Sequence, residues 1–181
     1  MKIIIVVGMP GSGKDEFLKI SKKFGLEVIK MGDVIRNEMI KRNLQITPEQ
    51  LPKFASEERE KNGMGIWAKR TIPYLTEKNS VIEGIRGDAE LNIFKHNFGG
   101  NLDIVCIFST PKTRYDRMKK RERRDDPSKI DDFVDRDQRE LRYGIGNVIA
   151  MSDYIIVNEG TLDDMEKASE RLIRNIIMDV E

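Results

Sequence analysis

The chain carries near its start the stretch Gly8-Met9-Pro10-Gly11-Ser12-Gly13-Lys14. An apolar run from Ile3 to Val7 precedes this stretch, and a helical pattern containing Phe17 and Ile20 follows it. This order predicts a strand, a glycine-rich loop and a helix. In such a loop the backbone N–H groups point inward, the helix dipole adds positive potential, and Lys14 adds a cation. We therefore expect the loop to bind the phosphates of a nucleoside triphosphate.

The residue after the lysine departs from the usual pattern of such loops, in which a serine or threonine hydroxyl follows. Asp15 stands there, and Glu16 comes next. A carboxylate is an oxygen ligand that suits Mg²⁺, although it also repels phosphates. Asp15 is therefore a candidate metal ligand, in direct contact or through water. The residues expected to hold the triphosphate are Gly8, Met9, Pro10, Gly11, Ser12, Gly13, Lys14, Asp15 and Glu16.

The composition of the 181 residues is that of a globular protein with one domain and a substantial core. The formal net charge is +1, so no overall field draws the chain to nucleic acid or to a membrane surface. No apolar run is long enough to span a membrane, and the chain begins with a strand pattern, so we expect a cytoplasmic protein without a membrane partner. A single cysteine in an apolar run, Cys106, and a single histidine, His96, argue against redox chemistry, zinc binding and a histidine-based triad.

Five short apolar segments alternate with helical patterns along the chain. This alternation predicts an α/β fold in which helices cover both faces of a five-stranded parallel sheet. Ligands bind such sheets at the carboxyl ends of the strands, which is where the glycine-rich loop falls. Thr161 and Asp164 form a capping box that opens the last helix. The segments expected to be strands are residues 3–7, 27–29, 81–83, 104–108 and 154–157.

Two features after the second of these segments suggest a site for a second ligand. Asp33 is expected at the N-cap of a helix, with Arg36 one turn later, where it can point back over the helix start. This signal is weak alone, because a first-turn arginine is often only a surface charge. Residues 47–79 have an interrupted helical pattern, and they either form a cap over that ligand or pack without touching it. The interruptions are expected at Pro52, Gly63, Gly65 and Pro73.

An acid ends the third expected strand, beside the glycine-rich loop. Glu83 can hold Mg²⁺ there, directly or through water, Gly84 lets the backbone approach a ligand, and Arg86 can bind a phosphate with two hydrogen bonds. The alternative is that Glu83 only caps a turn and that Arg86 is a surface charge. We favour the first interpretation because the glycine-rich loop is expected at the same edge of the sheet.

A run of basic residues follows the fourth expected strand. Residues 112–124 include eight basic and two acidic residues, whereas residues 125–140 include seven acids and three bases. The arginine spacing marks one helix face and suits a lid that closes on a triphosphate, with Arg136 and Arg139 on a second helix. The alternatives are a solvated helix with ion pairs to the acidic segment and a patch for an RNA backbone. The arginines on that face are Arg114, Arg117, Arg121 and Arg124.

With these motifs together, the chain resembles the P-loop monophosphate kinases, in particular the adenylate kinase-like and dephospho-CoA kinase-like group, which includes adenylate-kinase-related proteins of archaea. The glycine-rich stretch is similar to their phosphate loop, and residues 32–36 are similar to their Gly-Asp-x-x-Arg element, which binds the acceptor's phosphate. Residues 83–86 resemble their Asp-Gly-x-x-Arg segment, with glutamate replacing aspartate and one residue instead of two before the arginine. In that segment the acid serves the metal and the arginine serves the acceptor phosphate. Residues 152–161 look more like the last strand of dephospho-CoA kinases.

The resemblance implies a three-layer P-loop fold over residues 1–181, with a helical acceptor-binding insertion around 33–79 and a short arginine-rich lid around 114–143. It implies ATP and Mg²⁺ as cofactors, and transfer of the γ-phosphoryl group to a small nucleotide-like acceptor, either a nucleoside monophosphate or dephospho-CoA. Arg117 and Arg121 match the paired arginines that open the lid in this family. Arg136 or Arg139 match the arginines on the lid's second half, where the chain returns to the core. The implied catalytic residues are Lys14, Arg86, Arg117, Arg121 and Arg136, the acceptor residues are Asp33, Arg36 and Arg86, and the metal ligands are Asp15 and Glu83.

Two other functions stay open at this stage. The chain can be an ATP-binding switch that hydrolyses ATP slowly and binds RNA or a protein partner with the arginine face outward. Asp15 alone suggests a degenerate nucleotide-binding scaffold. For a kinase, a phosphate acceptor needs no general base, since positioning and electrostatic stabilisation carry that reaction. A hydroxyl acceptor needs one, and Asp15 and Asp33 are the candidates.

Overall fold

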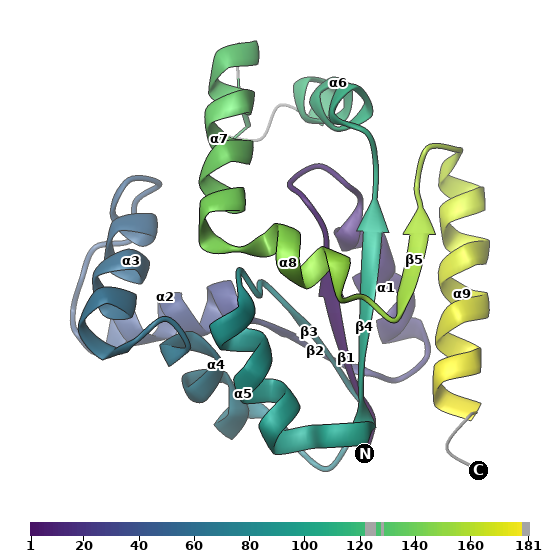
Figure 1. The fold of residues 1–181 in the computed structure, drawn as a ribbon, viewed down its shortest axis with the longest axis horizontal. Helices are drawn as coiled ribbons and strands as arrows, with labels where there is room; N and C mark the ends of the chain where they lie inside the picture. The colour runs from purple at the N-terminus through teal and green to yellow at the C-terminus, as the bar shows by residue number, and fades with distance from the viewer. Residues whose placement is uncertain (122–125, 128, 179–181) are drawn as a thin grey trace.

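Five parallel strands form a sheet in the computed structural model, which describes residues 1–121, 126–127 and 129–178 (Figure 1). Their order across the sheet is β2-β3-β1-β4-β5, so the strand that precedes the glycine-rich loop is central. The strands expected from the sequence are confirmed, and each end lies within two residues of its expected place. The strands are β1 Ile3–Val7, β2 Glu27–Lys30, β3 Ser80–Glu83, β4 Leu102–Phe108 and β5 Tyr154–Val157.

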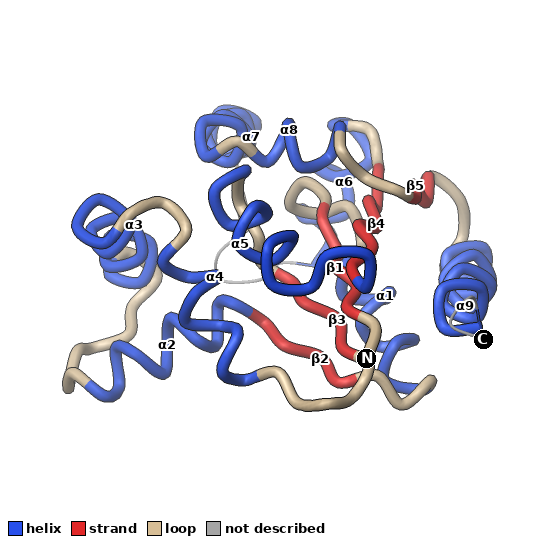
Figure 2. Tube along the Cα trace, turned by 60° about the horizontal axis from the view of Figure 1, so that its bottom comes forward, coloured by secondary structure: helices blue, strands red, loops and turns tan. Residues whose placement is uncertain are grey.

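Helices cover both faces of the sheet and give three layers, as predicted (Figures 1 and 2). Side chains alternate along β1, so that Ile3 and Ile5 face one layer while Ile4 and Val6 face the other. Burial on both faces explains why the sequence of this strand is continuously apolar. The first face carries α2 Met31–Lys41, α4 Ile66–Thr71, α5 Asp88–Phe98 and α8 Ile145–Ala150, and the second carries α1 Lys14–Lys23 and α9 Leu162–Met178.

The carboxyl ends of the strands carry the segments that the sequence assigned to ligands. The glycine-rich loop joins β1 to α1, and β2 runs directly into α2. After α2 the chain forms α3 (Gln50–Asn62), α4 and the 3-10 helix η1 (Ile72–Tyr74) before β3, and a second 3-10 helix, η2 (Gly99–Asn101), precedes β4. Two further helices, α6 (Pro111–Arg121) and α7 (Ile130–Tyr143), lie beyond the end of β4 (Figure 1).

Two local predictions are wrong. Asp33 is not an N-cap, because β2 continues straight into α2, whose N-cap is Lys30. Asp33 lies instead in the first turn of α2, where its carboxylate pairs with Arg36. Pro52 does not interrupt α3, because it is the third residue of the helix, where a backbone N–H has no partner within the helix. The predicted breaks at Gly63 and Gly65 fall at the end of α3 and the start of α4.

Cys106 is a core residue of β4, as the sequence indicated. Its side chain is buried, and burial raises the pKa of the thiol above its ordinary value. The neutral thiol is therefore a packing group and a poor nucleophile. Within residues 1–121, 126–127 and 129–178, no helix has the length and apolar character that crossing a membrane requires.

The capping box that opens α9 is confirmed. The N–H of Thr161 donates to Oδ2 of Asp164 at 2.9 Å, and the N–H of Asp164 donates to Oγ1 of Thr161 at 3.2 Å. Replacing Thr161 by alanine is expected to lower the free energy of unfolding by about 1 kcal/mol, while Thr161→Ser keeps the hydroxyl and most of the stability. Urea denaturation of the three proteins measures the difference, and equal midpoints for alanine and wild type would show that the box contributes nothing.

Candidate functional site

The glycine-rich loop forms a cradle of unpaired donors. Gly11 and Gly13 have φ angles of +82° and +101°, in the left-handed region. A Cβ atom at Gly11 would lie 3.0 Å from the carbonyl oxygen of Arg114, and one at Gly13 would collide with the side chain of Asn158. Among the described residues no acceptor takes the backbone N–H of Gly11 or Gly13, and Oγ of Ser12 is buried without a hydrogen bond. These groups fit the oxygen atoms of a polyphosphate.

Lys14 lies at the start of α1, directly over this cradle. Its Nζ donates to the carbonyl oxygens of Gly8 at 2.7 Å and of Met9 at 3.3 Å. Burial lowers the pKa of Lys14 from its ordinary 10.5, and the carboxylate of Glu83 opposes this shift. The ammonium group therefore lies where its charge is poorly compensated, and a phosphate group would supply the missing negative charge.

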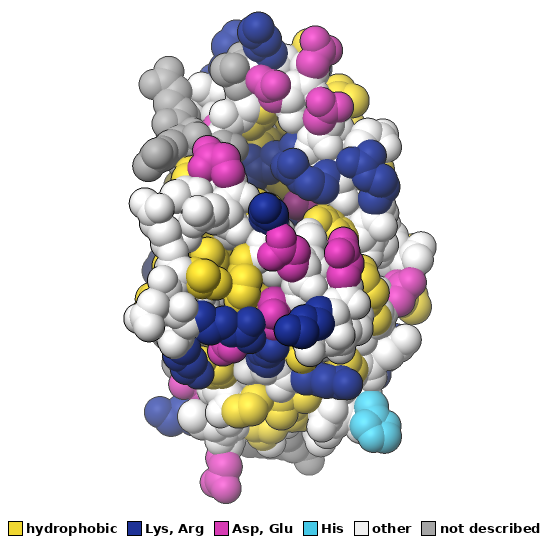
Figure 3. All heavy atoms as spheres, turned by 90° about the vertical axis from the view of Figure 1, so that its left-hand side faces the viewer, with side chains coloured by type: hydrophobic (Ala, Val, Ile, Leu, Met, Phe, Trp, Pro, Cys, Tyr) yellow, Lys and Arg dark blue, Asp and Glu magenta, His cyan; other side chains and the backbone are white. Residues whose placement is uncertain are grey.

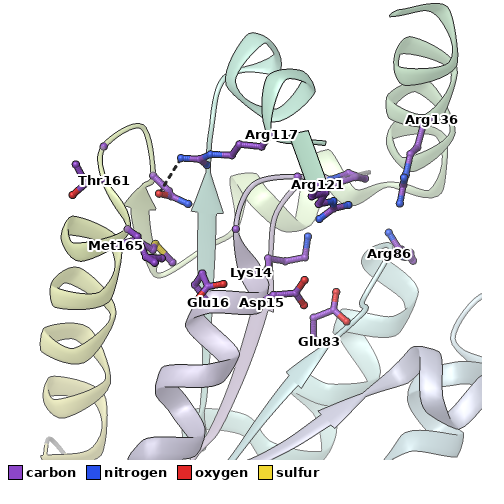
Figure 4. A pocket seen from close by; sticks show the side chains of 16 residues that line it. Lys14, Asp15, Glu16, Glu83, Arg86, Arg117, Arg121, Arg136, Thr161 and Met165 are labelled. Atoms are coloured by element: carbon purple, nitrogen blue, oxygen red, sulfur yellow. Dashed lines mark hydrogen bonds between the residues drawn. The ribbon is translucent and has the colours of Figure 1, made fainter. Parts of the chain in front are cut away.

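A cavity of about 590 Å³ lies over the loop, and we call it the loop cavity (Figure 4). Most residues that the sequence assigned to a triphosphate line it, whereas Gly8, Met9 and Ser12 lie outside its wall. The loop cavity also collects predicted residues from distant parts of the chain. The predicted residues in its wall are Pro10, Gly11, Gly13, Lys14, Asp15, Glu16, Glu83, Arg86, Arg117, Arg121 and Arg136.

Two carboxylates of the loop cavity suit a bound Mg²⁺. Figure 4 shows Asp15 on α1 and Glu83 at the end of β3 directed into the cavity, near Lys14. Nζ of Lys30 lies 3.5 Å from Oδ1 of Asp15 and offsets part of its charge. No group of three His, Cys, Asp or Glu side chains suited to a metal occurs among the described residues. The phosphates and water would therefore supply most ligands, as Mg²⁺ commonly requires, and the two carboxylates fit that arrangement.

A second cavity, of about 940 Å³, adjoins the first, and we call it the α3 cavity. Asp33 and Arg36 line it, and Nη1 of Arg36 donates to Oδ1 of Asp33 at 2.7 Å. Leu51 and Ala55 of α3 form part of its apolar wall. Figure 3 shows the side of the molecule that carries α3, where Lys and Arg side chains gather in two bands with acidic side chains between them. Residues of the 47–79 segment thus line part of the cavity wall, and whether this segment caps a bound ligand stays a prediction.

Among the described residues, three side chains line both cavities, namely Glu83, Arg86 and Arg136. The backbone N–H of Arg86 donates to Oε2 of Glu90 at 2.6 Å, and its guanidinium pairs with the carboxylate of Glu140 on α7. Burial acts to lower the pKa of Arg86, but the carboxylates of Glu140 and Glu83 outweigh it and raise the pKa. Arg86 is therefore a permanent cation at the boundary between the two cavities.

The predicted lid arginines on α6 do not share one environment. Arg117 reaches the ends of β4 and β5, where it donates to Oγ of Ser109 at 3.0 Å and to Oδ1 of Asn158 at 3.4 Å (Figure 4). Arg121 donates to both carboxylate oxygens of Asp126, each at 2.7 Å. Nη1 of Arg136 lies 3.8 Å from the same carboxylate, so Arg121 and Arg136 meet at one acid.

Arg114 has a structural place that the sequence did not indicate. It is buried, and its guanidinium donates to the carbonyl oxygen of Pro10 at 3.1 Å and to Oδ1 of Asp137 at 2.8 Å. Its charged group also lies over the ring of Phe133 at 5.0 Å. Arg114 thus fastens α6 and α7 to the glycine-rich loop, and this part of the arginine face turns inward. Arg124 lies outside the described residues.

Sequence reasoning missed four polar residues around these cavities. Nδ2 of Asn158 donates to the carbonyl oxygen of Ser12 at 2.8 Å, and its place just after β5 was a usable signal. Glu90 and Arg59 form a buried ion pair at 3.0 Å, although no role was assigned to Arg59. Glu140 entered only as one acid of the lid. The spacing of these four residues along the sequence does not indicate their contacts, because each contact joins two separate elements of the fold.

Comparison with known proteins places the chain in a family. Residues 7–133 match a family model described as an AAA domain. A UPF0200 protein of Methanococcus maripaludis strain C7 is 43% identical over 182 residues, which cover 98% of this chain and 98% of that protein. The chain belongs to both families. A UPF0200 protein of Pyrococcus abyssi is 42% identical over 181 residues and covers 97% of each chain, so the likeness of these UPF0200 proteins extends over nearly their whole length.

Solved structures of other proteins have the same fold as this UPF0200 protein. A gluconokinase from Sinorhizobium meliloti 1021 has a TM-score of 0.59 at 15% identity, covering 99% of this chain and 98% of its own. A shikimate kinase from Acinetobacter baumannii has a TM-score of 0.58 at 14% identity, covering 97% and 94%. At such identities the likeness concerns the fold alone. The predicted P-loop kinase fold is confirmed.

Proposed function

We propose that this protein is a Mg²⁺-dependent phosphotransferase that moves the γ-phosphoryl group of ATP to a small nucleotide-like acceptor. The observation that supports it most is the shared wall of the two cavities, formed by Glu83, Arg86 and Arg136. A group that passes between two ligands must cross a boundary that both ligands reach, and this boundary carries two cations.

On the donor side, the loop donors and Lys14 would bind the phosphates of ATP, and Arg117, Arg121 and Arg136 would stabilise the charge in transit. Asp15 and Glu83 would hold Mg²⁺, which supplies charge neutralisation to the phosphate oxygens when it is bound. The bond between phosphorus and the bridging oxygen of ADP breaks as a bond to the acceptor oxygen forms. With a phosphate acceptor, this chain needs only to orient the two ligands and exclude water.

On the acceptor side, the charges of the α3 cavity favour an anion. Among the described residues its wall contains six Lys and Arg side chains and three carboxylates, and two of the cations, Lys30 and Arg59, are paired with Asp15 and Glu90 outside the wall. Apolar side chains such as Ile35 and Leu51 offer contacts for the uncharged body of the acceptor. If the reacting group is a hydroxyl, Asp33 in this wall and Asp15 in the loop cavity would be the candidate bases.

The test is ATP consumption with a panel of acceptors. The panel contains nucleoside monophosphates, deoxynucleotides and dephospho-CoA, and the structural neighbours add gluconate and shikimate. One acceptor is expected to raise ATP use far above the rate in water and to yield a phosphorylated product. The proposal fails if ATP binds while no acceptor changes the rate, and an RNA or protein partner, bound in a salt-dependent way, then becomes the alternative.

The lowered pKa of Lys14 predicts a pH dependence for ATP binding. The triphosphate favours the protonated amine, so affinity is expected to stay level below the pKa of Lys14 in the free protein and to fall as pH rises through it. Because burial lowers that pKa, the fall begins at a lower pH than 10.5. Calorimetric titrations with ATP over a series of pH values below 10.5 measure it. The profile of Lys14→Met should be flat, and an equally flat wild-type profile would contradict the assignment.

A further inference from the structure

We propose that Glu140 is an internal substitute for the anionic group of the acceptor, and that the acceptor must displace it from Arg86 in order to bind. Glu140 thereby restricts the α3 cavity to ligands that interact with Arg86 more strongly than one carboxylate does. This inference rests on the proposed function, because it assumes that the α3 cavity receives the acceptor.

The first observation is that Arg86 already has an anionic partner. The carboxylate of Glu140 on α7 accepts a hydrogen bond from Nη1 of Arg86, and both side chains line the α3 cavity. The side chain of Glu140 is only 10% exposed, whereas the side chain of Arg86 is 37% exposed. The guanidinium is therefore reachable from the cavity, but one of its hydrogen-bonding positions is taken.

The second observation is that the main chain of Arg86 is held in place. Its N–H donates to Oε2 of Glu90 at 2.6 Å, and Oε1 of Glu90 also accepts from Nη2 of Arg59 at 3.0 Å. Glu90 is buried on α5, so the base of Arg86 is anchored to the core. An incoming anion cannot draw the whole residue away from Glu140. To use the donor Nη1 of Arg86, the anion has to exchange places with the carboxylate of Glu140.

The third observation is the surrounding charge. Arg136 and Arg139 lie on the same helix as Glu140 and line the α3 cavity, and Arg36 lines it from α2. The carboxylates of Glu83 and Glu90 also lie close enough to act on Arg86. A phosphate group with three oxygens and up to two charges can bind several of these cations at once. A ligand with a single carboxylate would only replace the carboxylate of Glu140 at Arg86, and this exchange would gain no binding free energy. Displacement therefore selects for strongly anionic acceptors.

The experiment measures sulfate binding by calorimetry, at constant ionic strength, with the loop cavity filled by Mg²⁺ and a non-hydrolysable ATP analogue. Glu140→Gln removes the charge and keeps the shape, and it is expected to bind sulfate about five- to tenfold more tightly than wild type. Asp135→Asn is the matched control, since Asp135 is exposed on the same helix and lines neither cavity. The control should stay within about twofold of wild type.

A second variant separates displacement from a general charge effect. Adding Arg86→Ala to Glu140→Gln should abolish the gain, because the gain requires a free guanidinium at Arg86. Unchanged or weaker sulfate binding by Glu140→Gln would overturn the inference, as would a gain that survives without Arg86. If the ATP analogue itself fails to bind wild type, the proposed function fails first, and the inference falls with it.

Discussion

Replacing Lys14 by methionine is expected to lower the rate of phosphoryl transfer by about 10² to 10³. Methionine matches the length of the lysine stem but carries no charge to place against the migrating phosphoryl group. The side chain of Lys14 is half-buried in the wall of the loop cavity, and burial weakens the screening of its charge by water, so most of the electrostatic contribution is lost. Single-turnover rates with the acceptor identified by the panel measure this change directly.

The matched control for that experiment is Lys22→Met, since Lys22 is exposed near the end of the same helix. It removes the same charge from the protein and should leave the rate within about twofold. Equal losses in Lys14→Met and Lys22→Met would mean that net charge, and not the position of Lys14, governs the rate. Wild-type turnover by Lys14→Met would show that Lys14 does not act on the transferred phosphoryl group, and it would contradict the proposed donor site.

Replacing Glu90 by alanine is expected to lower the free energy of unfolding by about 3 to 5 kcal/mol. Glu90 is 2% exposed and Arg59 is 6% exposed, and the carboxylate accepts from Nε and Nη2 of Arg59. Without Glu90 the guanidinium of Arg59 stays buried with no compensating charge, and the N–H of Arg86 loses its acceptor. Denaturant unfolding of wild type and variant, followed by circular dichroism, gives the difference.

Two further variants test whether the loss of stability comes from the buried charge of Arg59. Glu57→Ala breaks the Lys53–Glu57 pair of α3, whose side chains are 75% and 58% exposed, and is expected to change stability by at most about 0.5 kcal/mol. The double variant Glu90→Leu with Arg59→Met removes both buried charges and should recover most of the loss. A double variant no more stable than Glu90→Ala would show that packing, and not an uncompensated charge, causes the effect.

The glycine-rich loop illustrates how much of the site was readable from sequence. Its function depends on backbone N–H groups, the φ angles of Gly11 and Gly13 and one lysine, all within a few consecutive residues. Such short-range requirements leave a direct mark in the order of residue types. The place of Glu83 was also readable from sequence. Because β1 pairs in parallel with β3, the carboxyl end of β3 brings Glu83 to the same edge of the sheet as the glycine-rich loop.

The errors arose where a local signal competes with connections made at a distance. Asp33 has the residue type of an N-cap, but β2 passes into α2 without a loop, and the capping position falls on Lys30. The arginine spacing on α6 correctly places Arg114 and Arg117 on one face. That face turns toward the glycine-rich loop because Asp137 and the carbonyl of Pro10 offer Arg114 a buried set of acceptors.

The sequence by itself determined the sheet, the phosphate cradle and the list of charged residues that could serve two ligands, because these depend on periodicity and on short motifs. The tertiary structure alone decided which charges are paired. Glu90 holds Arg59 and the backbone of Arg86, and Glu140 holds the guanidinium of Arg86, across separations of 31, 4 and 54 residues. An ion pair depends on distance in space and on burial, and neither is encoded in the spacing of residues along the chain.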